Sequence, residues 1–289
     1  MGDTAQRGPR VAVVVPCFND GATLPATLAS LRAQEPHELV VVDDGSDDPE
    51  TLALLARLEQ EGTSLLRQRN AGPAAARMAG VSATSAPYVL ALDADDMIAP
   101  GSLTALADAL DADPGAAAAW GDTEMFGDAN VHVPKARALD PWQITYVNLV
   151  PTSSLIRRDA LVAAGGWQLE AGYEDWDLWM ALAERGLRGV HVPRTVVRHR
   201  LHGERRWSRD FDRHVAIEDE LRRRHPKLFA QRPRNWRGSR APWRSRLLFP
   251  VLYRVPLPPA QRFRLAIVLS NPIAVPRLWL QARRARARS

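Results

Sequence analysis

The sequence is poor in cysteine, in long apolar runs and, over its last part, in acidic residues. Its one cysteine, Cys17, excludes an intramolecular disulfide framework and any zinc site made of several cysteines. No apolar run approaches the roughly 18 to 20 residues that a membrane-spanning helix needs. The N-terminus does not resemble a signal peptide, because Pro16 interrupts its short apolar run. These absences disfavour extracellular, fibrous and integral-membrane classes, and we expect a cytoplasmic protein.

The chain otherwise has the composition of a globular protein, with 46% hydrophobic and 25% charged residues. Its net charge of +5 hides two regions of opposite charge. Residues 221–289 hold 18 Lys and Arg and no Asp or Glu, so residues 1–220 hold 20 basic and 33 acidic residues. This asymmetry predicts a catalytic domain over residues 8–225, followed by a basic, partly amphipathic extension over residues 226–289.

The first part of the chain alternates between strand-like and helix-like patterns. Continuous apolar, β-branched runs predict buried strands at residues 10–16, 38–43 and 88–92. Helical patterns fall between and after these strands, at residues 23–31, 48–58, 74–83 and 100–110. Strands that alternate with helices predict an α/β fold with a mainly parallel, doubly wound sheet. Further helices are expected at residues 158–164, 174–186 and 205–225.

Three clusters of carboxylates follow strands or begin a helix, at residues 43–44, 93–96 and 174–177. Ligands of open α/β sheets bind beyond the carboxyl ends of the strands. Several carboxylates in one cleft repel one another, and Mg²⁺ or Mn²⁺, which prefer oxygen ligands, would relieve that repulsion. The alternative is that these acids only cap helices and form turns. It stays open for residues 43–44 and is weaker for 93–96, because a turn rarely needs three carboxylates in four residues.

Several motifs follow one another along the chain: VVVPCFNDG, ELVVVDDGSDD, RNAGPAAAR, YVLALDADD and GYEDWDLWM. In content, order and spacing they resemble the nucleotide-sugar-binding half of family 2 glycosyltransferases, which have the GT-A fold. The resemblance covers roughly residues 8–204. It implies an inverting enzyme that transfers a sugar from a nucleoside diphosphate sugar, most commonly a UDP-sugar, to an acceptor hydroxyl. A glycan or lipid-linked acceptor in cell-surface polysaccharide or glycolipid synthesis would fit this family.

The resemblance also implies roles for individual residues of the donor site. The residues matched to the donor nucleotide are Pro16, Phe18, Asp44, Arg77, Asp93 and Ala94. Asp44 is expected to bind the base, in a pocket shaped by the backbone near Pro16 and Phe18. Arg77 is expected against the base or ribose, and Asp93 toward the ribose.

Metal binding and catalysis are assigned by the same resemblance. Asp95 is expected to bind the metal, and His202, in RHRLHG, to approach the donor diphosphate or its metal. That His202 is structural or simply exposed stays an open alternative. Asp175 matches the catalytic base, with Glu174 beside it. The chemistry needs these groups, because a cation stabilises the charge of the leaving diphosphate and a carboxylate must take the proton of the attacking hydroxyl.

The pKa of Asp175 depends on two opposed effects. A helix N-terminus lowers the pKa of a carboxyl, whereas burial beside tryptophans raises it, and the sequence leaves the balance open. Tryptophan is frequent in the acidic region, at Trp120, Trp142, Trp167, Trp176 and Trp179. Because indole rings stack on sugars, one or two of these are candidates for the acceptor site, and the others are expected in the core.

The basic extension has three interpretations. Arginines alternating with apolar stretches fit an anionic membrane surface, which would place the protein peripherally on the inner face of the cytoplasmic membrane. A solvated or disordered segment is the usual alternative for a charge run. Nucleic acid is disfavoured, because no nucleic-acid-binding motif accompanies the charge.

Two other functions stay open for the whole chain. A nucleotidyltransferase shares the nucleotide-binding sheet and the acidic metal site, but the segment NDGATLP lacks the basic residues that would bind a triphosphate. A non-catalytic nucleotide-sugar-binding protein is the second alternative. The three acids Asp93, Asp95 and Asp175 disfavour it.

Overall fold

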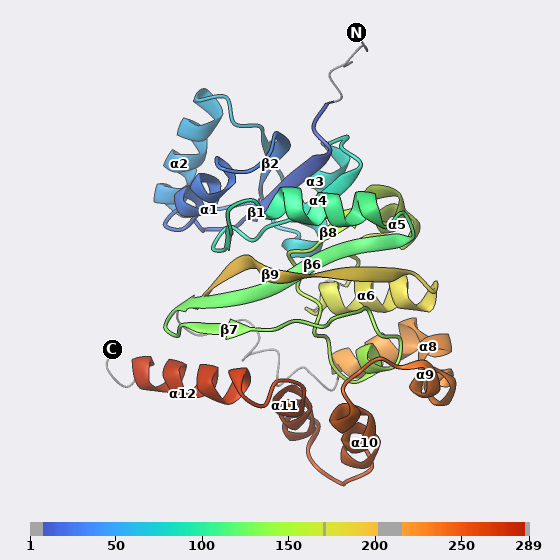
Figure 1. The fold of residues 1–289 in the computed structure, drawn as a ribbon. Helices are drawn as coiled ribbons and strands as arrows, with labels where there is room; N and C mark the ends of the chain where they lie inside the picture. The colour runs from blue at the N-terminus through green and yellow to red at the C-terminus, as the bar shows by residue number, and fades with distance from the viewer. Residues whose placement is uncertain (1–7, 170–171, 202–215, 287–289) are drawn as a thin grey trace.

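The computed structural model describes residues 8–169, 172–201 and 216–286. It contains one nine-stranded sheet in the order β3-β2-β1-β4-β8-β6-β9-β5, with β7 paired to β6 (Figure 1). The first four strands are parallel: β1 (Val11–Cys17), β2 (His37–Asp43), β3 (Leu65–Arg67) and β4 (Tyr88–Ala91). Residues 11–15 are all 0% exposed, as the continuous apolar run predicts for a strand covered on both faces.

Four helices belong to this part of the chain: α1 (Leu24–Leu31), α2 (Pro49–Gln60), α3 (Gly72–Ser82) and α4 (Ser102–Ala112). Helix α3 packs on β1 and β2, whereas α4 packs on the second half of the sheet. Asp48 caps α2 as expected, since its carboxylate accepts a hydrogen bond from the Thr51 N–H at 2.8 Å. Helix α3 lies very close to β1, because a Cβ atom on Gly80 would come within 2.2 Å of Val14 Cγ1. This close approach fixes the start of α3 near the carboxyl ends of β1 and β2.

The second half of the sheet is mixed. Strand β8 runs antiparallel to both β4 and β6, whereas β9 runs parallel to β6. The strands of this half are β5 (Met97–Ile98), β6 (Ala116–Gly127), β7 (Val131–Val133), β8 (Leu155–Arg157) and β9 (Arg188–Leu201). Its helical segments are η1 (Gln143–Thr145), α5 (Arg158–Ala163) and α6 (Glu174–Glu184). The α/β fold is therefore confirmed, with a parallel first half and a second half that mixes antiparallel pairs with the long parallel pair of β6 and β9.

The C-terminal region folds into helices below the sheet in Figure 1. These are residues 216–224, α8 (Pro226–Ala230), α9 (Arg232–Gly238), α10 (Trp243–Leu252), α11 (Pro259–Ser270) and α12 (Ala274–Arg286). Phe249 on α10 is 0% exposed and stacks on Trp142 with ring centroids 6.0 Å apart. The Asp140 carboxylate accepts hydrogen bonds from Ser239 Oγ and the Arg240 N–H. Residues 226–286 are therefore folded as helices, and α10 and residues 239–241 pack on the domain.

The helices of the described residues are short or polar relative to a membrane-spanning helix. Among the described residues, no single helix is long and apolar enough to cross a membrane. Residues 259–270 and 274–285 meet the length and composition only as a pair, and that pair is bent by 116°.

Candidate active site

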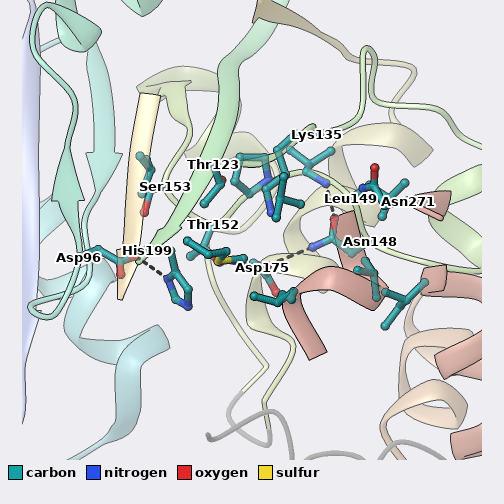
Figure 2. Close-up of a pocket in the computed structure, with 18 of the residues that line it drawn as sticks. Asp96, Thr123, Lys135, Asn148, Leu149, Thr152, Ser153, Asp175, His199 and Asn271 are labelled. Atoms are coloured by element: carbon teal, nitrogen blue, oxygen red, sulfur yellow. Dashed lines mark hydrogen bonds and ion pairs between the residues drawn. The ribbon is translucent and has the colours of Figure 1, made fainter. Parts of the chain in front are cut away.

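A cavity of about 360 Å³ lies where segments between residues 93 and 279 meet (Figure 2). Asp93 and Asp96 line it after β4, and Asp175 lines it at the start of α6. The loop 148–153 and strands β6, β7 and β9 form further walls, and residues of α11 and α12 complete them. The cavity therefore brings two of the three acidic clusters together and adds the C-terminal helices, which no sequence motif indicated.

Asp175 lies in the cavity wall, and its carboxylate is held in one orientation. Its Oδ2 accepts hydrogen bonds from Asn148 Nδ2 and Thr152 Oγ1, both at 3.0 Å (Figure 2). Its Oδ1 accepts one from the Trp176 N–H at 2.7 Å. Burial and the nearby charge of Glu174 raise the pKa of Asp175 to about 6, against the hydrogen bond from Thr152. The contest that the sequence left open is thus decided in favour of burial.

Arg77 connects the two acidic clusters of the cavity. Its guanidinium is 3% exposed and donates hydrogen bonds to Asp93 Oδ1 at 2.8 Å and to Glu174 Oε1 at 2.6 Å. It also lies over the Trp167 ring at 5.9 Å from the centroid. Arg77, which was expected against the nucleobase or ribose, therefore lies between Asp93 and Glu174, the neighbour of the candidate catalytic base.

Asp96 and His199 form a hydrogen-bonded pair at the cavity, in which the Asp96 carboxylate is buried and the His199 side chain is 37% exposed. Asp96 is 2% exposed, and its oxygens accept hydrogen bonds from His199 Nδ1 at 2.8 Å and from the Arg200 N–H at 3.0 Å. Burial opposes a charge on His199, but Asp96, Asp95 and Asp93 outweigh it and raise the pKa of His199. The sequence interpretation chose His202, which lies outside the described residues. His199 is the histidine that the structure places at the cavity.

Asp44 lies at the same edge of the sheet but does not line the cavity. It is 4% exposed, and Oδ1 accepts hydrogen bonds from Gln68 Nε2 at 2.7 Å and the Ala71 N–H at 2.8 Å. Oδ2 accepts one from the Gly72 N–H at 2.9 Å. Because a carboxylate offers about four acceptor positions, Asp44 has capacity for one further donor, such as the N–H of a base.

The remaining donor-side residues lie at the ends of β1 and β4. Phe18 is 43% exposed just after β1, so its ring is accessible, and Pro16 is half-buried within that strand. Ala94 is 2% exposed, and its carbonyl accepts a hydrogen bond from Thr27 Oγ1 at 2.8 Å. Helix α1 thereby holds the turn that carries Asp93 and Asp95.

The acids suit a metal that is shared with a substrate. Among the described residues, no three His, Cys, Asp or Glu side chains lie close enough to hold a cation by themselves. Asp95 is half-buried and the Asp93 side chain is 34% exposed, whereas both oxygens of Asp96 are engaged within the protein. One or two carboxylates together with phosphate oxygens make an ordinary Mg²⁺ site. The residues present therefore fit Mg²⁺ or Mn²⁺ bound with a diphosphate.

Asp177 and the five tryptophans singled out in the sequence are buried and contribute to the fold instead. Asp177 is 2% exposed and accepts hydrogen bonds from Arg224 Nε at 2.7 Å and His225 Nε2 at 3.0 Å, so it ties α6 to the C-terminal region. Each of the five tryptophans named as sugar-stacking candidates is at most 4% exposed. The tryptophan that lines the cavity is Trp279, on α12.

Comparison with known proteins identifies the family of the chain. The profile described as Glycosyl transferase family 2 matches residues 12–164. An uncharacterized glycosyltransferase of Mycobacterium tuberculosis is 30% identical over 215 residues, which cover 70% of this chain and 94% of that protein. The undecaprenyl-phosphate 4-deoxy-4-formamido-L-arabinose transferase of Serratia proteamaculans is 39% identical over 94 residues, 30% of this chain. That match spans only 29% of the Serratia protein.

Two solved structures share the fold at low sequence identity. TarS of S. aureus, in complex with UDP-GlcNAc, is 18% identical with a TM-score of 0.57, covering 96% of this chain and 87% of that one. The mannosyltransferase PcManGT from Pyrobaculum calidifontis, in complex with GDP-Man and Mn²⁺, is 19% identical with a TM-score of 0.58, covering 98% and 87%. Both likenesses support the GT-A-like fold expected from the motifs. Since the family profile spans more than half of the sequence and the mycobacterial relative aligns with 70% of it, this chain belongs to glycosyl transferase family 2.

Proposed function

We propose that the chain is an inverting glycosyltransferase that moves a sugar from a nucleoside diphosphate sugar to an acceptor hydroxyl. The observation that carries this proposal is the carboxylate of Asp175, which Asn148 and Thr152 orient in the wall of the cavity. Its pKa of about 6 leaves it unprotonated at neutral pH but basic enough to accept a proton as the hydroxyl attacks.

The proposed reaction is a single displacement. The acceptor oxygen forms a bond to the anomeric carbon while the bond from that carbon to the diphosphate oxygen breaks. The acceptor proton passes to Asp175, and the electron pair of the broken bond leaves with the diphosphate. Attack opposite the leaving group inverts the configuration at that carbon.

The donor-side residues have supporting roles in this proposal. Asp95, with Asp93, would hold Mg²⁺ or Mn²⁺, which when bound supplies positive charge next to the leaving diphosphate. Arg77 acts as a positioning residue, because its hydrogen bonds to Asp93 and Glu174 fix the distance between the donor side and the base. Asp44 would accept the N–H of the base with its remaining acceptor position.

A UDP-sugar is the donor that we propose first. The exposed ring of Phe18 and the acceptor position of Asp44 suit a nucleobase at the end of β1 and β2. Both UDP-GlcNAc and GDP-Man are bound by proteins of the same fold, so the base is to be tested directly. A glycan or lipid-linked acceptor is proposed, and for the lipid-linked class the support is that the name of the Serratia relative includes undecaprenyl phosphate.

Peripheral contact with an anionic membrane is proposed for α10. Trp243, Leu247 and Val251 follow one another at four-residue intervals and are 77%, 61% and 57% exposed. This spacing places them on one face of the helix. Exposed arginines in the same region, such as Arg240 and Arg254, would meet anionic headgroups.

The test of the proposed function is release of nucleoside diphosphate from a panel of UDP-, dTDP- and GDP-sugars, with Mg²⁺, Mn²⁺ or a chelator. We expect release from one class of donor only, and a product of inverted anomeric configuration by NMR. Pyrophosphate release from a nucleoside triphosphate and a sugar phosphate would instead establish the nucleotidyltransferase alternative. Donor binding without turnover on any acceptor would favour the non-catalytic alternative.

A further inference from the structure

One end of the cavity is apolar and is formed mainly by the C-terminal helices. Ile267 of α11 and Val275, Leu278 and Trp279 of α12 line it. In Figure 2, Asp96 lies toward one side of the cavity and Asn271, at the junction of α11 and α12, toward the other, with Asp175 between them. In the proposed function Asp175 contacts the acceptor hydroxyl, and the donor occupies the side of the strand ends. The apolar end is then the side left for the acceptor.

A lysine lies within this apolar surface. Lys135 follows β7 and lines the cavity near Leu149 and Asn271, whereas Asp96 and His199 lie at the other end (Figure 2). Lysine is rare in this arginine-rich chain, which contains only Lys135 and Lys227. Lys227 is exposed on α8, outside the cavity lining.

The charge of Lys135 has no matching partner in the described part of the chain. Among the described residues, no Asp or Glu carboxylate lies within ion-pair distance of the Lys135 ammonium group. The Asp122 carboxylate binds the backbone beside this lysine: its Oδ1 accepts a hydrogen bond from the Lys135 N–H at 2.9 Å and lies 2.9 Å from His191 Nε2. Burial lowers the pKa of Lys135, although Asp175, Asp122 and Asp96 act in the opposite direction. An ammonium group in such a place is stabilised by an anion that enters the cavity.

The backbone on both sides of Lys135 is held firmly. The Lys135 N–H donates to Asp122 on β6, and the Ala136 N–H donates to the Leu149 carbonyl at 3.1 Å. Asn271, at the junction of α11 and α12, donates from Nδ2 to the Pro134 carbonyl at 3.0 Å. The same junction therefore positions the lysine and the apolar wall beside it.

We propose that Lys135 binds an acidic group, a carboxylate or a phosphate, on an amphiphilic acceptor whose apolar part lies against α11 and α12. The proposal rests on the proposed function, and it narrows the acceptor to a class that carries both features. The acceptor hydroxyl then faces Asp175, and the acidic group and the apolar part lie on the side away from the donor.

The test uses two ligands that differ only at C6, which is a carboxylate in n-octyl β-D-glucuronide and a neutral hydroxymethyl group in n-octyl β-D-glucoside. Their affinities for the full chain are measured by isothermal titration calorimetry at pH 7.5, without any donor. We expect the wild type to bind the glucuronide at least about tenfold more tightly, since a charge-assisted hydrogen bond contributes on that scale. Lys135→Gln removes this preference, Lys135→Arg keeps most of it, and Lys227→Gln, the matched control, leaves it unchanged.

Three results would overturn the proposal: equal affinity of the wild type for both glycosides, binding of neither, or a preference that survives in Lys135→Gln. A separate titration with UDP and GDP distinguishes the source of the anion. If Lys135→Gln weakens nucleoside diphosphate binding by a similar factor, the lysine belongs to the donor diphosphate and the acceptor assignment is wrong. None of these titrations needs turnover. Failure of the proposed function would therefore appear in the transfer assay, and failure of the Lys135 proposal in the titrations.

Discussion

The two ends of the cavity are built in different ways. The donor end consists of short loops at the carboxyl ends of parallel strands, and its charged groups are paired with one another, as in the Arg77–Asp93–Glu174 bridge. The acceptor end consists of β7, a long loop and two C-terminal helices, and it combines apolar side chains with the unpaired charge of Lys135. If the two ends serve the donor and the acceptor as proposed, the first is prearranged for its ligand, and the second lacks a counter-charge that its ligand would supply.

The largest expected effect comes from the residue between the two ends. Asp175→Asn keeps the size and most of the polar contacts of the side chain but cannot accept the proton of the hydroxyl. We expect turnover to fall by about 10²- to 10⁴-fold, the usual contribution of a general base. Donor affinity should stay nearly unchanged. Asp219→Asn, the same change at an exposed position of the helix 216–224, is the control. Wild-type turnover in Asp175→Asn would show that the base is misassigned.

The pH profile examines the same carboxylate without a mutation. Because its pKa in the folded protein is about 6, above the ordinary value of 3.8, transfer should fall about tenfold per pH unit below pH 6. The sign for stability is opposite: the folded state binds the extra proton between about pH 4 and 6, so this group favours folding as the pH falls through that window. Asp175→Asn should lose that pH dependence of the melting temperature. An acid limb near pH 4 would contradict the burial of Asp175.

Disrupting the donor end should affect stability as well as activity. Arg77→Gln leaves the Asp93 and Glu174 carboxylates close together without their shared cation. Removing one partner from a buried ion pair costs on the order of 3 kcal/mol. We expect a lower urea midpoint and weaker donor binding, whereas Arg57→Gln, on the exposed face of α2, should change neither. If Arg77→Gln keeps the urea midpoint of the wild type, the ion pairs of Arg77 contribute little to stability. Any loss of donor binding in that variant then reports on the site alone.

A smaller effect, confined to the acceptor, is expected from α12. Trp279→Ala removes an aromatic side chain from the cavity wall, and we expect the KM for the acceptor to rise by about tenfold, the cost of roughly 1.4 kcal/mol of lost contact. Hydrolysis of the donor by water should be unchanged. The neighbouring Leu280 is 50% exposed, so Leu280→Ala serves as the control. Equal losses in hydrolysis and transfer would mean that α12 supports the whole domain.

The smallest effect is expected at the surface of α10. Leu247→Glu places a negative charge in the exposed apolar face of that helix, and we expect weaker sedimentation with vesicles of phosphatidylglycerol and phosphatidylcholine. Activity on a water-soluble acceptor should be unchanged, and high salt should release the wild type. Equal binding to neutral vesicles would argue against an electrostatic contact.

Much of the donor end was predictable because its residues follow strands. Local apolar runs locate β1, β2 and β4, and the acids after them necessarily meet at one edge of the sheet. The bridging position of Arg77 was not predictable, since it depends on how α6 returns to that edge. The positive charge of the C-terminal region suggested a surface role. It gave no sign that Phe249 stacks on Trp142 or that Trp279 lines the cavity.

The acceptor end was not predictable because no local spacing records it. Lys135 is an isolated lysine in a loop, and Asn148 and Thr152 come from a segment without periodic pattern. His199 sits among arginines on β9, where strand alternation alone gives two choices of face. A rare lysine in a chain that otherwise uses arginine was the one available signal.

The shared guanidinium of Arg77 has an electrostatic consequence for the order of events. The charge that offsets Asp93 also offsets Glu174, and Glu174 is one of the groups that set the proton affinity of Asp175. In the proposed function, a diphosphate and its cation beside Asp93 would alter the charge balance around Arg77 and so change the electrostatic field at Asp175. The base would then differ in strength between the empty enzyme and the donor-loaded one.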